Sequence, residues 1–220
     1  MEKILEKAIS LIKPQMTISF GGGNTVNRLI KEVAKQKLDI KVCTPSEVTK
    51  KNCQSLGMSV LELDQIKQID LAFDGCDSLD ENLNALKSNG GIHTFERIYA
   101  QQAKNYIILA PKERMRSQLD PDVFLCLEVV EAAIPQVCSV VSELGGQATV
   151  RQSSDIAGMV RTKLGNGLVD YTFDNWDQIE TIDQRLSSFN GVVSTSYFHG
   201  LVTAALLADN DQVIVKGSLK

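Results

Sequence analysis

Apolar residues recur at helical spacing in the first part of the chain and alternate there with short apolar runs. Residues 2–12 carry their apolar side chains on one stripe, which predicts a helix that ends before Pro14. The run 16–20 predicts a strand, and residues 26–33 return to helical spacing after a glycine-rich turn. Further strands are expected at 38–43, 58–63, 70–74 and 106–110, with helices at 46–55 and 92–103. This alternation predicts an α/β fold with a Rossmann-like, doubly wound, mostly parallel sheet.

The rhythm of the pattern changes after about residue 123. The expected elements are a strand at 124–130, a helix at 135–145, strands at 148–151 and 167–173, a helix at 176–189 and a strand at 192–197. This order predicts a smaller α+β domain of ferredoxin-like type. The apolar segment 201–219 is expected to return to the first domain. We therefore predict a catalytic domain of residues 1–125 plus 202–220, and a small domain of residues 126–201.

Composition narrows the class of protein. A chain of 220 residues, 43% of them hydrophobic, is long enough to bury a core without disulfides or metals. A net charge of -4 without a basic stretch disfavours a nucleic-acid partner. The sequence shows neither a signal peptide nor an apolar stretch of membrane-spanning length, so we expect a cytoplasmic protein with no membrane partner. Five scattered cysteines and only two histidines favour reduced thiols and disfavour a metal site.

The glycine-rich turn 21–25 lies between a predicted strand and a predicted helix. Glycine lets the backbone approach a phosphate closely, and the amides at a helix start favour an anion. A tight turn that needs glycine only for packing explains the same residues equally well. Dinucleotide binding is disfavoured, because Val26 stands where a third glycine is needed and the next strand ends in Cys43-Thr44 without an acidic residue.

The segment 74–100 carries the most chemistry. Asp74 and Asp77 follow the carboxyl end of a predicted strand, which is the edge where open α/β sheets bind ligands. Glu96 lies within a predicted helix on a face that it shares with apolar residues. Partial burial there raises the pKa of a carboxyl group, which is then suited to accept and return a proton. On spacing alone, a turn and a solvated helix surface explain these residues as well.

The same segment resembles the signature of the ribose-5-phosphate isomerase type A family. Both have D-G-x-D, an acidic loop, L-N-x-[IL]-K, a glycine turn and a helix with Glu-[Lys/Arg]-Ile. The residues that agree in register are Asp74, Gly75, Asp77, Leu83, Asn84, Lys87, Gly90, Gly91, Glu96 and Ile98. Residues 21–25 resemble the family's GTGST phosphate loop, and residues 165–170 resemble its DNGNxxxD strand. The resemblance covers nearly the whole chain.

The resemblance implies an aldose-ketose isomerase of the non-oxidative pentose phosphate pathway, acting without metal or organic cofactor. Ribose 5-phosphate and ribulose 5-phosphate would interconvert through a cis-enediolate, with Glu96 as general base. The other implied catalytic residues are Asp74, Asp77 and Lys87. The implied substrate-binding residues are Gly23, Asn24, Thr25, Thr44, Ser46, Asn89, Gly90, Gly91 and Arg114, with Lys112 as a second candidate for the phosphate charge. Family members form homodimers and homotetramers, so we expect one of these assemblies.

Departures from the family pattern keep alternatives open. They are Gly22, Asn24, Ser88-Asn89 and Lys163-Leu164, and they surround the expected phosphate and hydroxyl contacts. An isomerase for a different sugar phosphate is therefore one alternative, and a non-catalytic sugar-phosphate sensor is another. Four further residues are expected to have structural roles: His93 as a bystander, Cys76 as a packed thiol, and Tyr171 and Trp176 as core of the small domain.

Overall fold

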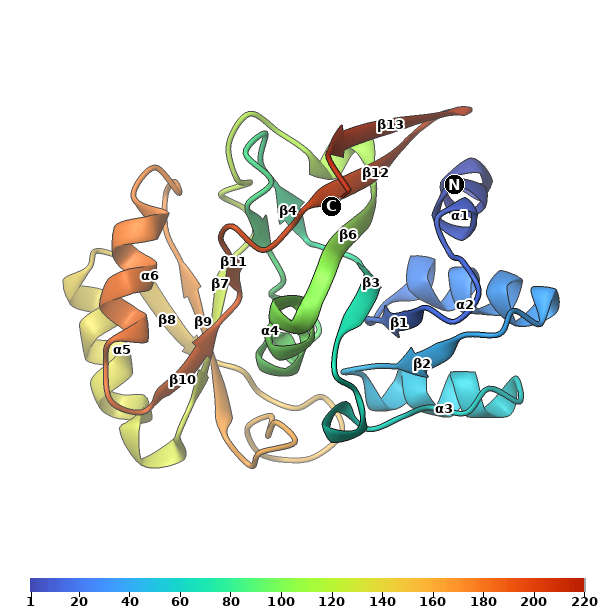
Figure 1. The fold of residues 1–220 in the computed structure, drawn as a ribbon. Coiled ribbons are helices and arrows are strands. Elements are labelled where there is room, and N and C mark those ends of the chain that lie inside the picture. Colours follow the sequence, from blue (N-terminus) through green and yellow to red (C-terminus); the bar gives the residue numbers. More distant parts are fainter. Residues whose placement is uncertain (220) are drawn as a thin grey trace.

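The computed structural model describes residues 1–219, and its largest sheet has six strands (Figure 1). The strands are β1 (Thr17–Phe20), β2 (Lys41–Cys43), β3 (Ile69–Asp74), β6 (Ala103–Pro111), β12 (Ala204–Asp209) and β13 (Gln212–Gly217). The helices of this part are α1 (Glu2–Ser10), α2 (Asn24–Gln36), α3 (Glu47–Ser55) and α4 (His93–Gln102). The strand order is β13-β12-β6-β3-β1-β2, and all neighbours are parallel except β13, which forms an antiparallel hairpin with β12.

Helices cover both faces of this sheet, as the prediction of a doubly wound fold requires. Phe20 of β1 and Phe73 of β3 face α1 and α2, and their rings stack with centroids 6.4 Å apart. Ala72 of β3 and Tyr106 of β6 face the other side, where α4 contributes Tyr99. Neighbouring residues of a strand point to opposite faces of the sheet. Because both faces are buried here, the strand sequences are continuous apolar runs.

The second part of the chain forms a four-stranded antiparallel sheet. Its elements are β7 (Leu125–Val129), α5 (Ile134–Glu143), β8 (Gln147–Val150), β9 (Gly167–Thr172), α6 (Ile179–Ser187) and β10 (Val192–Thr195). The strand order β10-β7-β9-β8 and the sequence βαββαβ are those of a ferredoxin-like fold, so the predicted fold class is confirmed. The helices α5 and α6 lie on the left in Figure 1, and Tyr171 and Trp176 pack edge to face in the core beneath them.

A third, short sheet connects the two parts. It contains β4 (Ser78–Leu79), β5 (Ala85–Leu86) and β11 (Tyr197–Phe198), in the order β11-β5-β4. Because β11 follows β10 directly, the chain crosses from the four-stranded sheet and pairs with the loop region after β3. The proposed domain boundaries near residues 125 and 202 stay a prediction.

The predicted strand at 58–63 is wrong. This segment makes only one bridge, between Val60 and Val42, and then enters a 3-10 helix at Leu63–Gln65. The neighbouring strand β2 has only three residues, so it offers little backbone with which a further strand can pair. Two other short 3-10 helices are Lys112–Arg114 and Glu131–Ala133. None of the helices in the described part of the chain has the length and apolarity needed to cross a membrane.

Candidate active site

The candidate site forms at the carboxyl ends of the parallel strands. Asp74 is the last residue of β3, and Gly21 follows the neighbouring strand β1. The backbone amide of Gly21 donates to the carbonyl of Phe73 at 2.8 Å, which holds the two strand ends together. In open α/β sheets ligands bind at this edge. The sheet topology therefore brings the glycine-rich loop next to the acidic segment.

A buried cluster of three charged side chains lies at this edge. The Nζ of Lys87 is 3.1 Å from Oδ1 of Asp74 and 3.2 Å from Oε1 of Glu96. The same Nζ donates to the carbonyl of Gly75 at 2.6 Å. All three charged side chains are at least nine-tenths buried. The tertiary structure thus brings together three of the four predicted catalytic residues.

The charge balance of the cluster decides which group holds a proton. Two carboxyl groups share one ammonium group, so only one carboxylate is balanced. Burial and the neighbouring Asp74 raise the pKa of Glu96 to about 8, although Lys87 opposes the shift. Burial opposes the charge of Lys87, but Asp74 and Glu96 raise its pKa above the ordinary value. Glu96 therefore has a pKa close to neutral pH, which suits a group that takes and returns a proton.

Asp74 is held by donors on both oxygens. The hydroxyl of Tyr106 donates to Oδ2 at 2.9 Å, and the amide of Gly75 donates to Oδ1 at 2.8 Å. The amide of Gly22 adds a longer bond of 3.3 Å to Oδ1. These donors fix the carboxyl group of Asp74 beside the ammonium of Lys87. Tyr106 lies in an apolar strand, so the sequence gave no signal of its polar contact with Asp74.

Gly21 is required for space. A Cβ at this position would overlap the carboxyl group of Asp74. We expect Gly21→Ala to displace that carboxylate and to lower kcat by about 10²-fold, the cost of a misplacement of about 1 Å. Steady-state kinetics and circular dichroism of the purified variant measure the effect. The control is Gly158→Ala, whose added Cβ meets no heavy atom within 4 Å among the described residues. Equal activity of the two variants would contradict this role.

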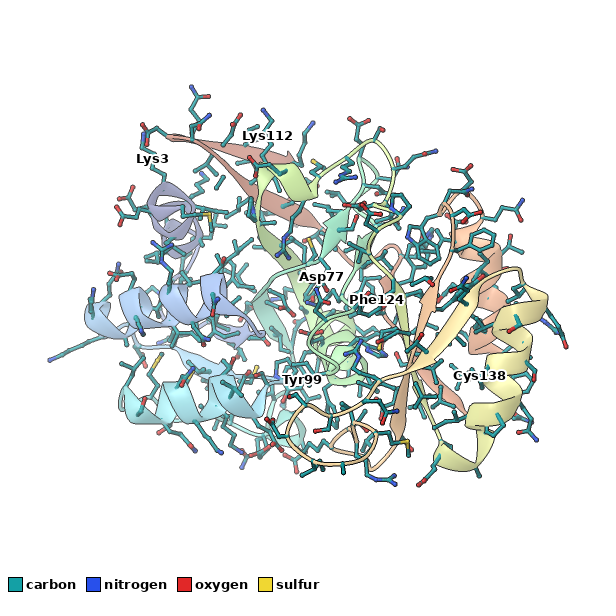
Figure 2. The ribbon with its side chains drawn as sticks, turned by 180° about the vertical axis from the view of Figure 1, so that it is seen from behind. Lys3, Asp77, Tyr99, Lys112, Phe124 and Cys138 are labelled. Atoms are coloured by element: carbon teal, nitrogen blue, oxygen red, sulfur yellow. The ribbon has the colours of Figure 1, made fainter. Side chains whose placement is uncertain are left out.

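Asp77 anchors the turn between β5 and α4. Its Oδ2 accepts from the amides of Ser88 at 2.7 Å and Asn89 at 2.9 Å, and its Oδ1 accepts from Nδ2 of Asn89 at 2.7 Å. Arg114 lies 3.6 Å from Asp77 and donates to the carbonyl of Cys76. Figure 2 shows Asp77 in the central region of the molecule. The structure thus places Arg114 beside the acidic segment.

The glycine-rich loop lies directly against Glu96. A Cβ at Gly22 would be 3.9 Å from Oε1 of Glu96. Gly23, with a φ of +90°, is the N-cap of α2, and glycine adopts this conformation without strain. Asn24 and Thr25 open the helix, with Asn24 exposed and Thr25 half-buried. The amides of this first turn favour an anion next to the buried cluster.

The start of α3 supports this loop. Ser46 is the N-cap, and its Oγ accepts from the amide of Thr49 at 3.2 Å. Thr49 in turn donates from Oγ1 to the carbonyl of Gly21 at 2.8 Å. Thr44 and Ser46 are both buried, and the amide of Ser46 donates to Oγ1 of Thr44 at 3.1 Å. The two predicted ligand residues therefore form one turn beside the loop.

The start of α4 completes the surroundings. Asn89 and Gly90 are exposed in the turn before the helix, and Gly91 is half-buried with a φ of +65°. A Cβ at Gly91 would crowd Leu168 of β9 and also approach Arg151. The small domain therefore packs against the turn that carries three of the predicted substrate-binding residues.

Three further residues named from the sequence are not members of the charged cluster. Lys112 pairs with Asp209 at 2.7 Å. His93 is fully buried, its Nε2 lies 3.3 Å from the carbonyl of Ser194, and its Nδ1 has no hydrogen-bond partner among residues 1–219. Burial lowers the pKa of His93 to about 4 and raises the pKa of Cys76 to about 12. Both groups are therefore neutral at physiological pH.

Two sets of contacts at the site were not predicted from the sequence. Arg151, just after β8, donates to the carbonyls of Ser88 and Asn89 in the turn before α4. Glu128 of β7 is buried and accepts from Thr94 of α4. Both contacts join residues more than 30 positions apart, so local spacing does not reveal them. Within the described part of the chain, no group of three His, Cys, Asp or Glu residues is arranged to hold a metal ion.

Comparison with known proteins agrees with this geometry. The sequence model of the family described as ribose 5-phosphate isomerase A (phosphoriboisomerase A) matches residues 41–212. Ribose-5-phosphate isomerase A of Prochlorococcus marinus (strain MIT 9312) is 30% identical over 210 residues, which cover 93% of this chain and 89% of the relative.

Solved structures show the same fold. The structure of ribose 5-phosphate isomerase A from Methanocaldococcus jannaschii superposes with a TM-score of 0.92 at 27% identity, over 98% of this chain and 97% of that one. A D-ribose-5-phosphate isomerase in complex with phospho-erythronic acid superposes with a TM-score of 0.93 at 24% identity, over 98% of this chain and 96% of that one. The likeness extends over 98% of this chain in both comparisons.

Proposed function

Because the chain belongs to the ribose 5-phosphate isomerase A family, we propose that it interconverts ribose 5-phosphate and ribulose 5-phosphate. The observation that carries this proposal is the position of Glu96, buried beside the glycine-rich loop and 3.2 Å from Lys87. A base for this reaction needs a pKa near neutral pH and a neighbouring cation where negative charge develops. Glu96 and Lys87 supply these two properties.

The proposed reaction moves one proton between adjacent carbons. Glu96 removes the proton from C2 of the open-chain aldose, the C1–C2 double bond forms, and the carbonyl at C1 becomes an enediolate oxygen. The hydroxyl proton on the C2 oxygen is transferred to the C1 oxygen, the carbonyl forms at C2, and Glu96 returns its proton to C1. One carboxyl group thus serves as base and then as acid. Positioned proton transfer of this kind accelerates reactions by about 10²–10⁴-fold.

Charge on the enediolate oxygens needs fixed donors. The ammonium of Lys87 and the amides of Gly90 and Gly91, which lie in the turn before α4, are proposed for this role. Asp74 and Asp77 are proposed to bind substrate hydroxyls and to relay the hydroxyl proton during ring opening. The bonds that Asp77 accepts from the turn fix its position relative to that turn.

The phosphate group needs donors at the other end of the substrate. Gly23, Asn24 and Thr25 at the start of α2 are proposed to bind it through backbone amides and side chains. Thr44, Ser46 and Asn89 are proposed as further polar contacts. Arg114 is proposed for the phosphate charge, since a guanidinium group binds phosphate in a bidentate manner. Its side chain is 45% exposed and therefore accessible to a ligand.

Turnover in deuterium oxide tests the proposal. The wild-type protein, assayed with a chelator present, is expected to convert ribose 5-phosphate to ribulose 5-phosphate and to incorporate deuterium at C1 of the product. Faster turnover of another aldose phosphate in a substrate panel would favour the alternative of a different substrate. Binding of ribose 5-phosphate without exchange of its C2 proton would favour a sensor and would overturn the proposal.

The pH dependence of the reaction follows from the raised pKa of Glu96. Because the base must be ionised, we expect kcat/KM to rise with pH and to level off above about pH 8. The contribution of Glu96 to the stability of the folded protein changes with pH in the opposite direction. The pKa of Glu96 in the folded protein lies above the ordinary value of 4.5, so the contribution of Glu96 to stability is full below pH 4.5 and is lost as the pH rises through about 8. Kinetics from pH 5 to 9 measure the first effect, and a flat profile would contradict it.

Assembly and location are proposed on the same basis. We propose a homodimer or homotetramer, since members of the family assemble in this way, and we propose a location in the cytoplasm. Sedimentation equilibrium measures the assembly, and fractionation of cells measures the location. A monomer at micromolar concentration would contradict the first statement.

A further inference from the structure

Arg151 connects the small domain to the turn before α4. Its Nε and Nη2 bond the two carboxylate oxygens of Asp170 on β9, at 2.9 and 2.6 Å. Its guanidinium carbon lies 5.2 Å from the ring centroid of Phe124, which Figure 2 shows in the central region near Asp77. The side chain is only 17% exposed. The carboxylate and the ring therefore hold the guanidinium plane in one orientation.

The remaining donors of this guanidinium bind two peptide groups of the turn. Nη2 donates to the carbonyl of Ser88 at 2.8 Å, and Nη1 donates to the carbonyl of Asn89 at 3.1 Å. The Ser88 carbonyl shares its peptide group with the amide of Asn89, which donates to Asp77 at 2.9 Å. The Asn89 carbonyl shares its peptide group with the amide of Gly90, in the exposed part of the turn.

We propose that Arg151 is a positioning residue for the reaction. It orients and polarises two consecutive peptide groups. The amide of the first, on Asn89, fixes Asp77. The amide of the second, on Gly90, becomes a stronger hydrogen-bond donor to the enediolate oxygen. This inference rests on the proposed isomerase function. A cation on the carbonyl side of a peptide group strengthens the amide on its other side, because hydrogen bonds in a chain polarise one another by about 10–30% per bond.

The geometry favours arginine over any other residue here. Three nitrogens of one rigid plane are used, and they bind a carboxylate and two carbonyls at the same time. A lysine is a single point charge on a flexible stem and cannot hold these acceptors in fixed directions. A residue that only stabilises the contact between two domains does not need to bind two neighbouring carbonyl groups in fixed directions.

The test compares Arg151→Ala with Arg161→Ala in the full-length protein. Arg161 is a matched arginine on the same connection, paired at the surface with Glu131 at 2.8 Å. We expect Arg151→Ala to lower kcat by about 10–100-fold with KM changed less than about threefold, since loss of a direct oxyanion donor costs about 10²–10³-fold. Arg161→Ala is expected to keep the wild-type kcat.

Two further measurements separate positioning from a general structural role. Nuclear magnetic resonance of the unliganded protein is expected to show upfield shifts of the Asn89 and Gly90 amide protons in Arg151→Ala but not in Arg161→Ala. Added guanidinium is expected to restore part of the kcat of Arg151→Ala alone. Arg151→Lys keeps the positive charge but not the planar guanidinium group. Its kcat is expected to be closer to that of Arg151→Ala than to that of wild type. It also replaces the alanine variant in all measurements if that variant does not fold.

Binding of phospho-erythronic acid gives a third measurement. The carboxylate of this compound imitates the two enediolate oxygens. Arg151→Ala is therefore expected to raise the dissociation constant of the compound by a larger factor than it raises KM for the substrate. Equal kcat in Arg151→Ala and wild type, or unshifted Asn89 and Gly90 amides, would overturn the inference. Failure of the wild-type protein to turn over ribose 5-phosphate would overturn the proposed function instead, and the amide shifts would still test the effect of Arg151 on the turn.

Discussion

Replacement of Glu96 by glutamine is expected to lower kcat for ribose 5-phosphate by at least about 10²-fold, and up to about 10⁴-fold. Glutamine has nearly the same shape but cannot accept the C2 proton. The substitution also relieves the excess negative charge around Lys87, because Asp74 then balances the ammonium alone. We therefore expect unchanged or higher stability above pH 8, together with the loss of activity. Steady-state kinetics and urea unfolding on the same preparation measure both effects.

The combination of lost activity and retained stability makes this prediction specific. A variant that is inactive because it is unfolded would show a lower free energy of unfolding, which is the opposite sign. Deuterium incorporation at C1 is expected to disappear in parallel with turnover. Residual turnover within tenfold of wild type would show that another group is the base, and Glu96 would then be only a structural carboxyl group.

Replacement of Lys87 by methionine is expected to give the largest loss of stability, about 3–5 kcal/mol at pH 8, and also to abolish turnover. Methionine fills a similar volume but leaves Asp74 and Glu96 buried without a cation. Both carboxyl groups are ionised in the unfolded chain at this pH. The loss is therefore expected to shrink as the pH falls and the buried carboxyl groups take up protons. Urea unfolding at pH 5 and pH 8 measures this difference.

A double variant and a surface control test the cause of this loss. Lys87→Met combined with Glu96→Gln removes one of the uncompensated carboxylates, so part of the lost stability is expected to return. Lys104→Met breaks a pair with Asp70 at 2.9 Å whose side chains are 47% and 26% exposed, and it is expected to cost less than about 1 kcal/mol. If Lys87→Met costs no more than Lys104→Met, the cluster does not have the assigned charge balance.

The sequence by itself determined the order of the main elements and the chemistry of the catalytic segment. Helical and strand periodicities reflect which side chains are buried on one face or on two, and that information is local. It correctly gave the parallel sheet and the ferredoxin-like order of the second part. The family resemblance further selected Asp74, Asp77, Lys87 and Glu96 as catalytic residues, and the structure brings the carboxyl groups of Asp74 and Glu96 within 3.2 Å of the ammonium of Lys87. Local patterns failed at residues 58–63, where the half-buried segment lacks a long neighbouring strand.

Only the tertiary structure decided how the site is held together. The space that Gly21 leaves for Asp74 and the bond from Tyr106 both depend on which strands are neighbours in the sheet. The clamp of Arg151 on the turn before α4 depends on how the small domain packs. These contacts join residues 32 to 63 positions apart. Their identity is fixed by burial, by hydrogen-bond direction and by charge balance in three dimensions, and none of these produces a periodic signal along the chain.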